Sequence, residues 1–176
     1  MKILVTNDDG IFSSGIISLW EVAKEFGDVT VVAPNSEQSA VSHGITISKP
    51  IYIKEITRKN SFNGYAVSGT PADCVKIALK NIMNSTPELI LSGINIGSNL
   101  GNNIIYSGTV SAAIEGSFLG IPSFAISLDT FDPISSFASS KSIIRKIINK
   151  IELSKIPLGS ISVSYTHLTL PTKRIV

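Results

Sequence analysis

Two adjacent acidic residues at the end of an apolar segment place the tightest limit on how this chain folds. Lys2–Thr6 is short and rich in β-branched and aliphatic residues, which predicts a buried strand. Asp8 and Asp9 follow within the sequence Asn-Asp-Asp-Gly, so both carboxylates come at the mouth of that strand. At a separation of ~4 Å, two such charges repel by about 4 kcal/mol at an effective dielectric constant of about 20.

This repulsion requires a compensating group. A shared proton, a basic side chain or a bound cation would each reduce it. The sequence has no lysine or arginine between Lys2 and Lys24. A bound cation is therefore the leading hypothesis, and its remaining ligands are expected elsewhere in the chain.

The segment after the acidic pair predicts a βαβ unit. Ser13 or Ser14 caps a helix that we expect over about Gly15–Phe26. Asp28–Ala33 contains the sequence Val-Thr-Val-Val-Ala, which predicts a second buried strand. A strand, a helix and a strand in close succession form a βαβ unit with parallel strands. Ligands of such sheets bind at the C-terminal ends of the strands.

Beyond this unit, strand patterns and helical patterns continue to alternate. The remaining expected elements are, in order, strands at Thr46–Glu55 and Tyr65–Val67, a helix capped by Thr70 that runs to about Asn84, a strand at Leu89–Leu91, a helix that opens at Ser107, a strand at Ser123–Leu128 and a helix over about Ser136–Ile151. The first two strands are expected to form a small antiparallel excursion. The order predicts an α/β fold with a mostly parallel central sheet.

Two other predicted strand ends carry oxygen-bearing side chains. The loop after the second strand offers several serines near position 39, and the loop after Leu89–Leu91 offers asparagines near position 95. Together with Asp8 and Asp9, they offer hydroxyl, amide and carboxylate oxygens, and the sequence has no cluster of cysteines or histidines. Such a donor set suits a hard cation such as Mg²⁺, Mn²⁺ or Ca²⁺.

Ser107, Gly108 and Thr109 are expected at the N-terminus of the next helix. The free backbone N–H groups and the helix dipole make such a terminus an anion site, commonly for phosphate. The chain has no P-loop lysine motif and no G-x-G-x-x-G directly after the first strand, so nucleoside triphosphate hydrolysis and dinucleotide binding lack support. A cation beside a phosphate site predicts phosphoryl chemistry.

Composition argues against several other classes of protein. Hydrophobic residues make up 43% of the chain, but charges, glycines and serines interrupt every long apolar stretch, so no membrane span is expected. The residues before the first strand do not form a signal-peptide pattern, so secretion is not expected. The single cysteine, Cys74, excludes an internal disulfide and fits a reducing cytoplasm. The formal net charge of +2 is not arranged as a basic stripe, so no nucleic-acid partner is expected.

The last segment of the chain, residues 163–176, resembles translated sequencing-adaptor read-through. We therefore expect an α/β domain over residues 1–162 and a non-native tail over residues 163–176, with further natural sequence missing. Lys173 and Arg174 are the only charged residues of this tail, so the net charge without it falls from +2 to 0.

Five motifs in register resemble the SurE family of metal-dependent 5′-nucleotidases. They are Met1–Gly10, Ala33-Pro34 with Glu37–Ala40, Ser68–Cys74, Ser92–Gly97 and Tyr106–Thr109. The resemblance covers roughly residues 1–160. It implies a Rossmann-like, three-layer core from which the C-terminal part of the family fold is missing here.

The resemblance also implies an activity, a cofactor and partners. The activity is the hydrolysis of nucleoside 5′-monophosphates to nucleosides and phosphate, and the cofactor is one divalent cation, Mg²⁺ or Mn²⁺. The family implies cytoplasmic homodimers or tetramers. The cation ligands implied for this chain are Asp8, Asp9, Ser39 and Asn95.

Asp8 and Asp9 are the expected catalytic residues, and Ser107–Thr109 are expected to bind the phosphate. The nucleophile is either a water molecule or one of the two aspartates, which would form an aspartyl-phosphate. His43 is a candidate acid for the leaving alkoxide, although a loop histidine more often has no catalytic role.

Two other functions compete with hydrolysis by this family mechanism. A Rossmann-like module that binds a metal–nucleotide without hydrolysing it would act as a sensor. A phosphatase of the haloacid dehalogenase type would use an aspartate nucleophile, but that class separates its two aspartates by one residue. Asp8 and Asp9 are adjacent, which argues against it.

Overall fold

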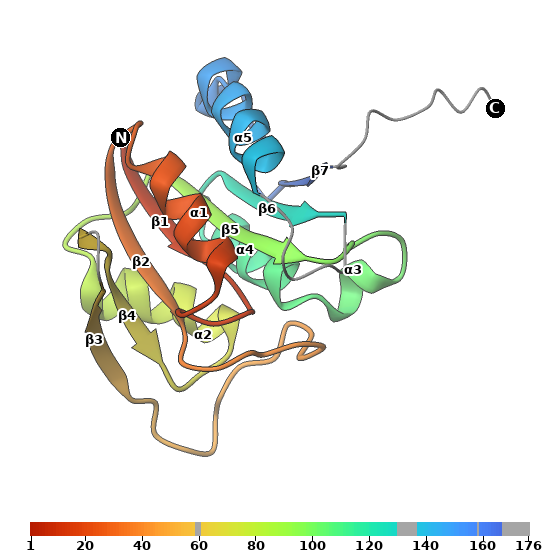
Figure 1. Cartoon of the computed structure of the whole chain (residues 1–176). Helices are drawn as coiled ribbons and strands as arrows, with labels where there is room; N and C mark the ends of the chain where they lie inside the picture. Colours follow the sequence, from red (N-terminus) through yellow and green to blue (C-terminus); the bar gives the residue numbers. More distant parts are fainter. Residues whose placement is uncertain (59–60, 130–136, 158, 167–176) are drawn as a thin grey trace.

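A seven-stranded sheet forms the centre of the computed structural model, which describes residues 1–58, 61–129, 137–157 and 159–166 (Figure 1). Its order is β3-β4-β2-β1-β5-β6-β7. The strands are β1 Lys2–Thr6, β2 Asp28–Pro34, β3 Ile53–Thr57, β4 Asn63–Val67, β5 Leu89–Ile96, β6 Ser123–Leu128 and β7 Ile161–Thr166. Every neighbouring pair is parallel except β3 with β4. The predicted α/β fold with a mostly parallel sheet is confirmed.

Helices cover both faces of the sheet (Figure 1). The helical elements are α1 Ser14–Ala23, α2 Pro71–Ile77, the π-helical segment η2 Ala78–Ile82, α3 Asn103–Tyr106, α4 Gly108–Phe118, α5 Ala138–Lys150 and the short 3₁₀ helix η3 Leu153–Lys155. Within β1, Ile3 and Val5 pack in one apolar cluster with residues of α1 and α5, and Leu4 packs in another with residues of α2 and α4. A strand buried on both faces explains the continuous apolar run in the sequence.

The predicted starts of α1 and α2 are confirmed by local side-chain caps. The Ser13 hydroxyl accepts a hydrogen bond from the Ile16 N–H at the start of α1. Thr70 and Asp73 form a capping box at the start of α2, in which each side chain accepts from the other residue's backbone N–H. These contacts span only three residues, which is why the sequence pattern is sufficient to predict them.

The predicted ends of two elements are wrong. Helix α1 ends at Ala23 rather than Phe26, because the N–H groups of the last residues, such as Phe26 to Ala23 O, bond three residues back in tighter turns. Strand β5 does not end at Leu91 but continues to Ile96. A register shift lets the added part keep its pairing with β6.

The predicted antiparallel excursion is only partly correct. Strands β3 and β4 pair antiparallel, as expected, but β4 also pairs parallel with β2, so the two strands extend the main sheet. The first strand begins at Ile53 rather than Thr46. The Thr46 N–H instead donates to the carboxylate of Asp73, which holds the segment before β3 away from strand pairing.

Strand β7 follows the C-terminal helical elements and pairs in parallel with β6. The sequence-based boundary at residue 162 falls inside this strand. Residues 167–176 lie outside the described part of the chain, and the non-native origin of the tail stays a prediction. Helix α5 lies within the predicted range, whose first residue, Ser136, is also outside the described residues. In the ranges that are described, we find no helix with both the length and the apolar character needed to cross a bilayer.

Gly15 lets helix α1 approach strand β5 at the distance of direct backbone contact. A Cβ atom at this position would lie 2.0 Å from the carbonyl oxygen of Ile94. Because a backbone atom cannot rotate away, we expect Gly15→Ala to lower the free energy of unfolding by roughly 3 kcal/mol, measured by urea denaturation. Ser14→Ala, at an exposed position of the same turn, is the control and should change stability by less than about 0.5 kcal/mol. A Gly15→Ala protein as stable as the wild type would contradict this packing.

Candidate active site

The C-terminal ends of three neighbouring strands meet at one edge of the sheet. Strand β1 lies between β2 and β5 and is parallel to both, so the segments that follow them converge there. A pocket of about 420 Å³ lies at this edge. Its lining includes all four predicted cation ligands, Asp8, Asp9, Ser39 and Asn95, together with Glu37, Asn99, Asn103, Tyr106 and Ser107.

The turn that carries the two aspartates is fixed by its own asparagine. The Nδ2 atom of Asn7 donates to the Gly10 carbonyl oxygen at 3.0 Å and to the Ser13 hydroxyl at 2.8 Å. Gly10 has a φ of 94°, a conformation that favours glycine. The Asn-Asp-Asp-Gly sequence therefore links the end of β1 to the cap of α1 and presents the aspartates between them.

Asp8 is buried and bonded to the start of helix α4. Its carboxylate accepts hydrogen bonds from the hydroxyl and the backbone N–H of Thr109. Burial nevertheless raises the pKa of Asp8, because it disfavours the charged form more than these hydrogen bonds favour it. Of the predicted phosphate-binding residues, Ser107 lines the pocket, whereas Gly108 and Thr109 pack against Asp8 behind it.

Asp9 also has a raised pKa. Its pKa is raised from 3.8 to about 7, first by burial and then by the negative charges of Asp8 and Glu37. A hydrogen bond from the backbone of Ile96 acts in the opposite direction and is weaker. Glu37 lies in the same loop as Ser39, but no sequence pattern indicated that it would raise the pKa of Asp9. That effect depends on the proximity of the two residues in the folded chain.

The donor atoms of the pocket fit a hard divalent cation. Among the described residues that line it there is no lysine or arginine to neutralise the carboxylates. The Asn95 Nδ2 atom donates to the Gly97 carbonyl oxygen at 2.8 Å, which leaves the amide oxygen as the ligand atom. The Ser39 hydroxyl donates its proton to Glu37, which leaves oxygen lone pairs for a cation. Carboxylate, amide and hydroxyl oxygens are the ligands that Mg²⁺ and Mn²⁺ prefer.

Helix α4 begins at the edge of the pocket. Its cap is Ser107, whose hydroxyl accepts from the Val110 N–H at 3.1 Å and whose carbonyl oxygen accepts from the Ser111 hydroxyl at 2.7 Å. Ser107 therefore has a fixed side chain at the positive end of an 11-residue helix. This arrangement can accommodate an anion next to the carboxylate cluster.

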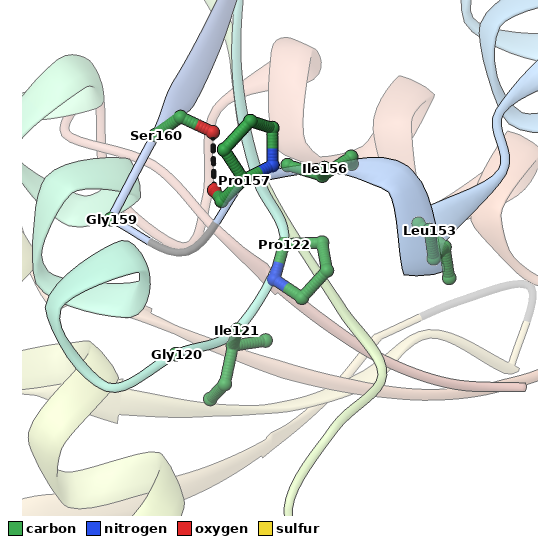
Figure 2. Close-up of a pocket in the computed structure, with 8 residues that line it drawn as sticks. All are labelled: Gly120, Ile121, Pro122, Leu153, Ile156, Pro157, Gly159 and Ser160. Carbon is green, nitrogen blue, oxygen red and sulfur yellow. Dashed lines mark hydrogen bonds between the residues drawn. The ribbon is translucent and has the colours of Figure 1, made fainter.

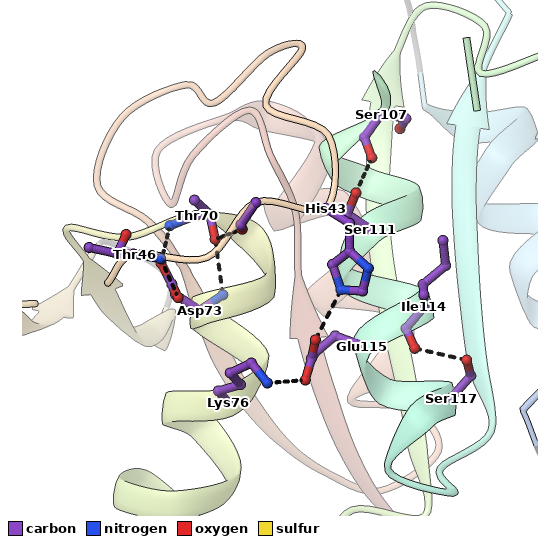
Figure 3. Close-up of polar contacts among 11 residues, drawn as sticks. His43, Thr46, Thr70, Asp73, Lys76, Ser107, Ser111, Ile114, Glu115 and Ser117 are labelled. Carbon is purple, nitrogen blue, oxygen red and sulfur yellow. Dashed lines mark hydrogen bonds and ion pairs between the residues drawn. The ribbon is translucent and has the colours of Figure 1, made fainter. Parts of the chain in front are cut away.

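His43 does not line the pocket. Figure 3 shows its imidazole directed at Glu115 on helix α4, with a distance of 2.9 Å between Nε2 and the carboxylate. The structure therefore gives no support to the candidate role of His43 as the acid for the leaving group. The contact joins residues 72 positions apart, which no local sequence pattern could have indicated.

A second pocket, of about 240 Å³, lies by the N-terminal ends of β6 and β7 (Figure 2). It is lined by the turn before β6, at Gly120–Pro122, and by the segment from Leu153 to Ser160 that precedes β7. Its described lining is mainly apolar and contains no ionisable side chain. The chemistry of the molecule is therefore expected at the carboxylate-lined pocket.

The raised pKa of Asp9 makes stability depend on pH in a defined direction. Between pH ~4 and ~7 the folded protein retains a proton that the unfolded chain has released, so the stability of chelator-treated protein should fall as pH rises. The expected loss is at most about 4 kcal/mol, measured by urea denaturation in EDTA at several pH values. Asp9→Asn should flatten this part of the curve. If the unfolding free energies of the wild type and of Asp9→Asn rose by the same amount between pH 5 and 7, the burial of Asp9 would be contradicted.

Comparisons with known proteins find relatives that match most of this chain. The 5′-nucleotidase SurE of Syntrophobacter fumaroxidans is 45% identical over 175 residues, which cover 99% of this chain and 69% of that protein. The 5′-nucleotidase SurE of Solidesulfovibrio magneticus is 55% identical over 135 residues, 76% of this chain and 52% of that protein. The crystal structure of the SurE protein from Aquifex aeolicus superposes with a TM-score of 0.80 at 38% identity, covering 94% of this chain and 66% of that one.

The chain thus spans between about half and about two thirds of the length of these relatives. The family model described as survival protein SurE matches residues 3–173, a range that includes every strand end of the pocket and continues into the C-terminal tail. Because the family model matches most of the chain and a relative covered to 69% of its length is 45% identical, this chain belongs to the SurE family.

Proposed function

We propose that the protein is a 5′-nucleotidase that hydrolyses nucleoside 5′-monophosphates with the help of a divalent cation. One observation carries the proposal: three strand ends bring Asp8, Asp9, Ser39 and Asn95 to a single pocket at whose edge helix α4 begins. The relatives named 5′-nucleotidase SurE support the same reaction.

In this proposal Asp8 and Asp9 are the principal anchors of the cation, Mg²⁺ or Mn²⁺. The carbonyl oxygen of the Asn95 amide and the Ser39 hydroxyl complete the protein ligands. When bound, the cation supplies positive charge that lowers the two raised carboxylate pKa values and neutralises charge developing on the phosphate. Thr109 fixes the orientation of the Asp8 carboxylate.

The phosphate of the substrate is proposed to lie against Ser107 at the N-terminus of α4, where the helix dipole favours an anion. Attack on phosphorus forms one new P–O bond while the bond to the ribose 5′-oxygen breaks, and that oxygen takes up a proton to give the nucleoside. Water attacks directly, or Asp8 or Asp9 attacks first and water then releases phosphate from the aspartyl-phosphate.

A phosphate-release assay tests this proposal. The purified protein is incubated with adenosine or guanosine 5′-monophosphate and Mn²⁺ or Mg²⁺, and free phosphate is measured with and without EDTA. We expect release only with the cation, and much slower release from adenosine 3′-monophosphate, which serves as the substrate control. Cation-dependent nucleotide binding without phosphate release from folded protein would favour the sensor function instead.

A cytoplasmic location and assembly into dimers or tetramers belong to the same proposal. The single cysteine, Cys74, is buried in the described structure, in agreement with a protein that does not depend on disulfides. Size-exclusion chromatography with light scattering tests the assembly, and a monomeric mass across the micromolar range would contradict it.

A further inference from the structure

The loop that supplies Ser39 to the pocket has an unusual backbone. It follows β2 and also carries Glu37, and both side chains are exposed. Ala40 and Ser42 have φ values of 56° and 55°. This is the left-handed region, which residues other than glycine and asparagine rarely adopt. Such a conformation persists only where surrounding contacts hold it. The contacts that hold this loop therefore affect the geometry of the pocket.

The strongest contact is made by His43 with a buried carboxylate on helix α4. Glu115 has a residue exposure of only 5%. Its Oε2 lies 2.9 Å from His43 Nε2, and its Oε1 lies 2.6 Å from Lys76 Nζ on α2 (Figure 3). Since an ionised carboxylate only accepts hydrogen bonds, Nε2 is the donor. The His43 ring also stacks on Phe118, with 5.7 Å between ring centroids.

The other contacts of this loop are hydrogen bonds between neutral groups or lie beyond His43. Next to Ser39, the backbone N–H of Gln38 donates to the Asp8 carbonyl oxygen at 2.7 Å. The N–H of Ser42 donates to the Tyr106 carbonyl oxygen at 3.1 Å, and its hydroxyl donates to that of Ile105 at 2.9 Å. Thr46 is bonded to Asp73 beyond His43. Hydrogen bonds to charged groups are about twice as strong as neutral ones, so the bond between His43 and Glu115 is the main side-chain attachment.

We propose that His43 is a positioning residue: by bonding to Glu115, it holds the loop so that Ser39 faces Asp8 and Asp9. This inference rests on the proposed function, in which Ser39 is a cation ligand. Without the bond, the loop would sample other conformations, and cation binding would have to restore order in several backbone residues. The expected consequence is weaker cation binding with little change in the fold.

Three substitutions of His43 separate positioning from general stability. His43→Gln places an amide N–H at about the reach of Nε2, so it keeps the donor to Glu115. His43→Asn carries the same amide on a shorter side chain and does not reach, and His43→Ala removes the donor. Lys141→Ala is the matched control elsewhere, because it breaks a 2.5 Å ion pair with Glu21 that joins α5 to α1 away from the pocket.

Affinity for Mn²⁺ is measured by titration calorimetry on the protein without nucleotide, and folding is followed by circular dichroism. We expect His43→Ala and His43→Asn to bind Mn²⁺ roughly tenfold more weakly, and His43→Gln and Lys141→Ala to remain close to the wild type. If His43→Ala does not fold, the comparison of Gln with Asn decides the matter, because the two differ only in reach.

The outcomes distinguish an error in the proposed cation site from an error in the positioning role of His43. A wild-type protein that binds no Mn²⁺ contradicts the proposed cation site itself. A wild type that binds Mn²⁺, with His43→Asn or His43→Ala binding equally well, overturns the positioning role alone. Equal weakening by His43→Gln and His43→Asn would also overturn it, because the donor to Glu115 would then be irrelevant.

Discussion

Asp9→Asn is expected to abolish cation-dependent phosphate release, with a loss of about a thousandfold or more in kcat/KM. Asparagine keeps the shape of the side chain but removes one of the negative charges that attract the cation. The same change should raise the stability of chelator-treated protein at pH 8, because a carboxylate with a pKa of about 7 no longer has to be ionised in a buried position.

These two effects of Asp9→Asn have opposite signs, which separates them from ordinary structural damage. Activity is measured by phosphate release, and stability by urea denaturation in EDTA. Asp28→Asn is the control, because it neutralises an exposed aspartate at the N-terminal end of β2, away from the pocket. Full turnover by Asp9→Asn would show that Asp9 does not anchor the cation. An unchanged unfolding free energy would show that ionisation of Asp9 does not destabilise the fold.

Gly108→Ala is expected to lower activity by about a hundredfold while the protein remains folded. A Cβ atom at Gly108 would lie 2.7 Å from the Asp8 Cβ and 3.0 Å from its Oδ2. Helix α4 is fixed in the core by side chains such as Ala112, which is fully buried, so Asp8 must move instead. A misplacement of about 1 Å in an active site costs on the order of a hundredfold in rate.

The measurement for Gly108→Ala is kcat/KM together with the unfolding free energy, which should fall by about 1–3 kcal/mol. Gly101→Ala is the matched control near the same pocket. Its Cβ would meet no atom within 4 Å, although its φ of 56° carries a small cost of its own. Equal activity of Gly108→Ala and Gly101→Ala would refute the view that close packing against α4 sets the position of Asp8.

Local patterns in the sequence were enough to predict most of the fold. Strand β1 is an apolar run followed by an acidic turn, and Thr70 and Asp73 mark the start of α2 by a contact over three residues. Asp8 and Asp9 were predicted from their position after a strand, and a serine and an asparagine were expected after two parallel neighbours. The resemblance to the SurE family then identified these two as Ser39 and Asn95. The structure brings all four to one pocket.

The sequence did not predict features that depend on contacts between distant segments. Strand β4 joins β2 because the sheet edge is available there, and β5 runs on to Ile96 because β6 continues to pair with it. Gly93, a residue type common in turns, lies inside β5, so the local pattern indicated an earlier end of the strand. The sequence also did not indicate that the Thr109 hydroxyl bonds to Asp8, 101 residues away.

The sequence by itself determined the α/β class, the order of the elements and the oxygen-rich residues at the strand ends, because these follow from local periodicity, capping and chain direction. Only the tertiary structure decided how those residues are supported. Burial raises the pKa of Asp9, Thr109 holds Asp8, and Glu115 receives the histidine of the Ser39 loop. The physical reason is that desolvation and side-chain hydrogen bonds act through space, between residues that the chain brings together only when it folds.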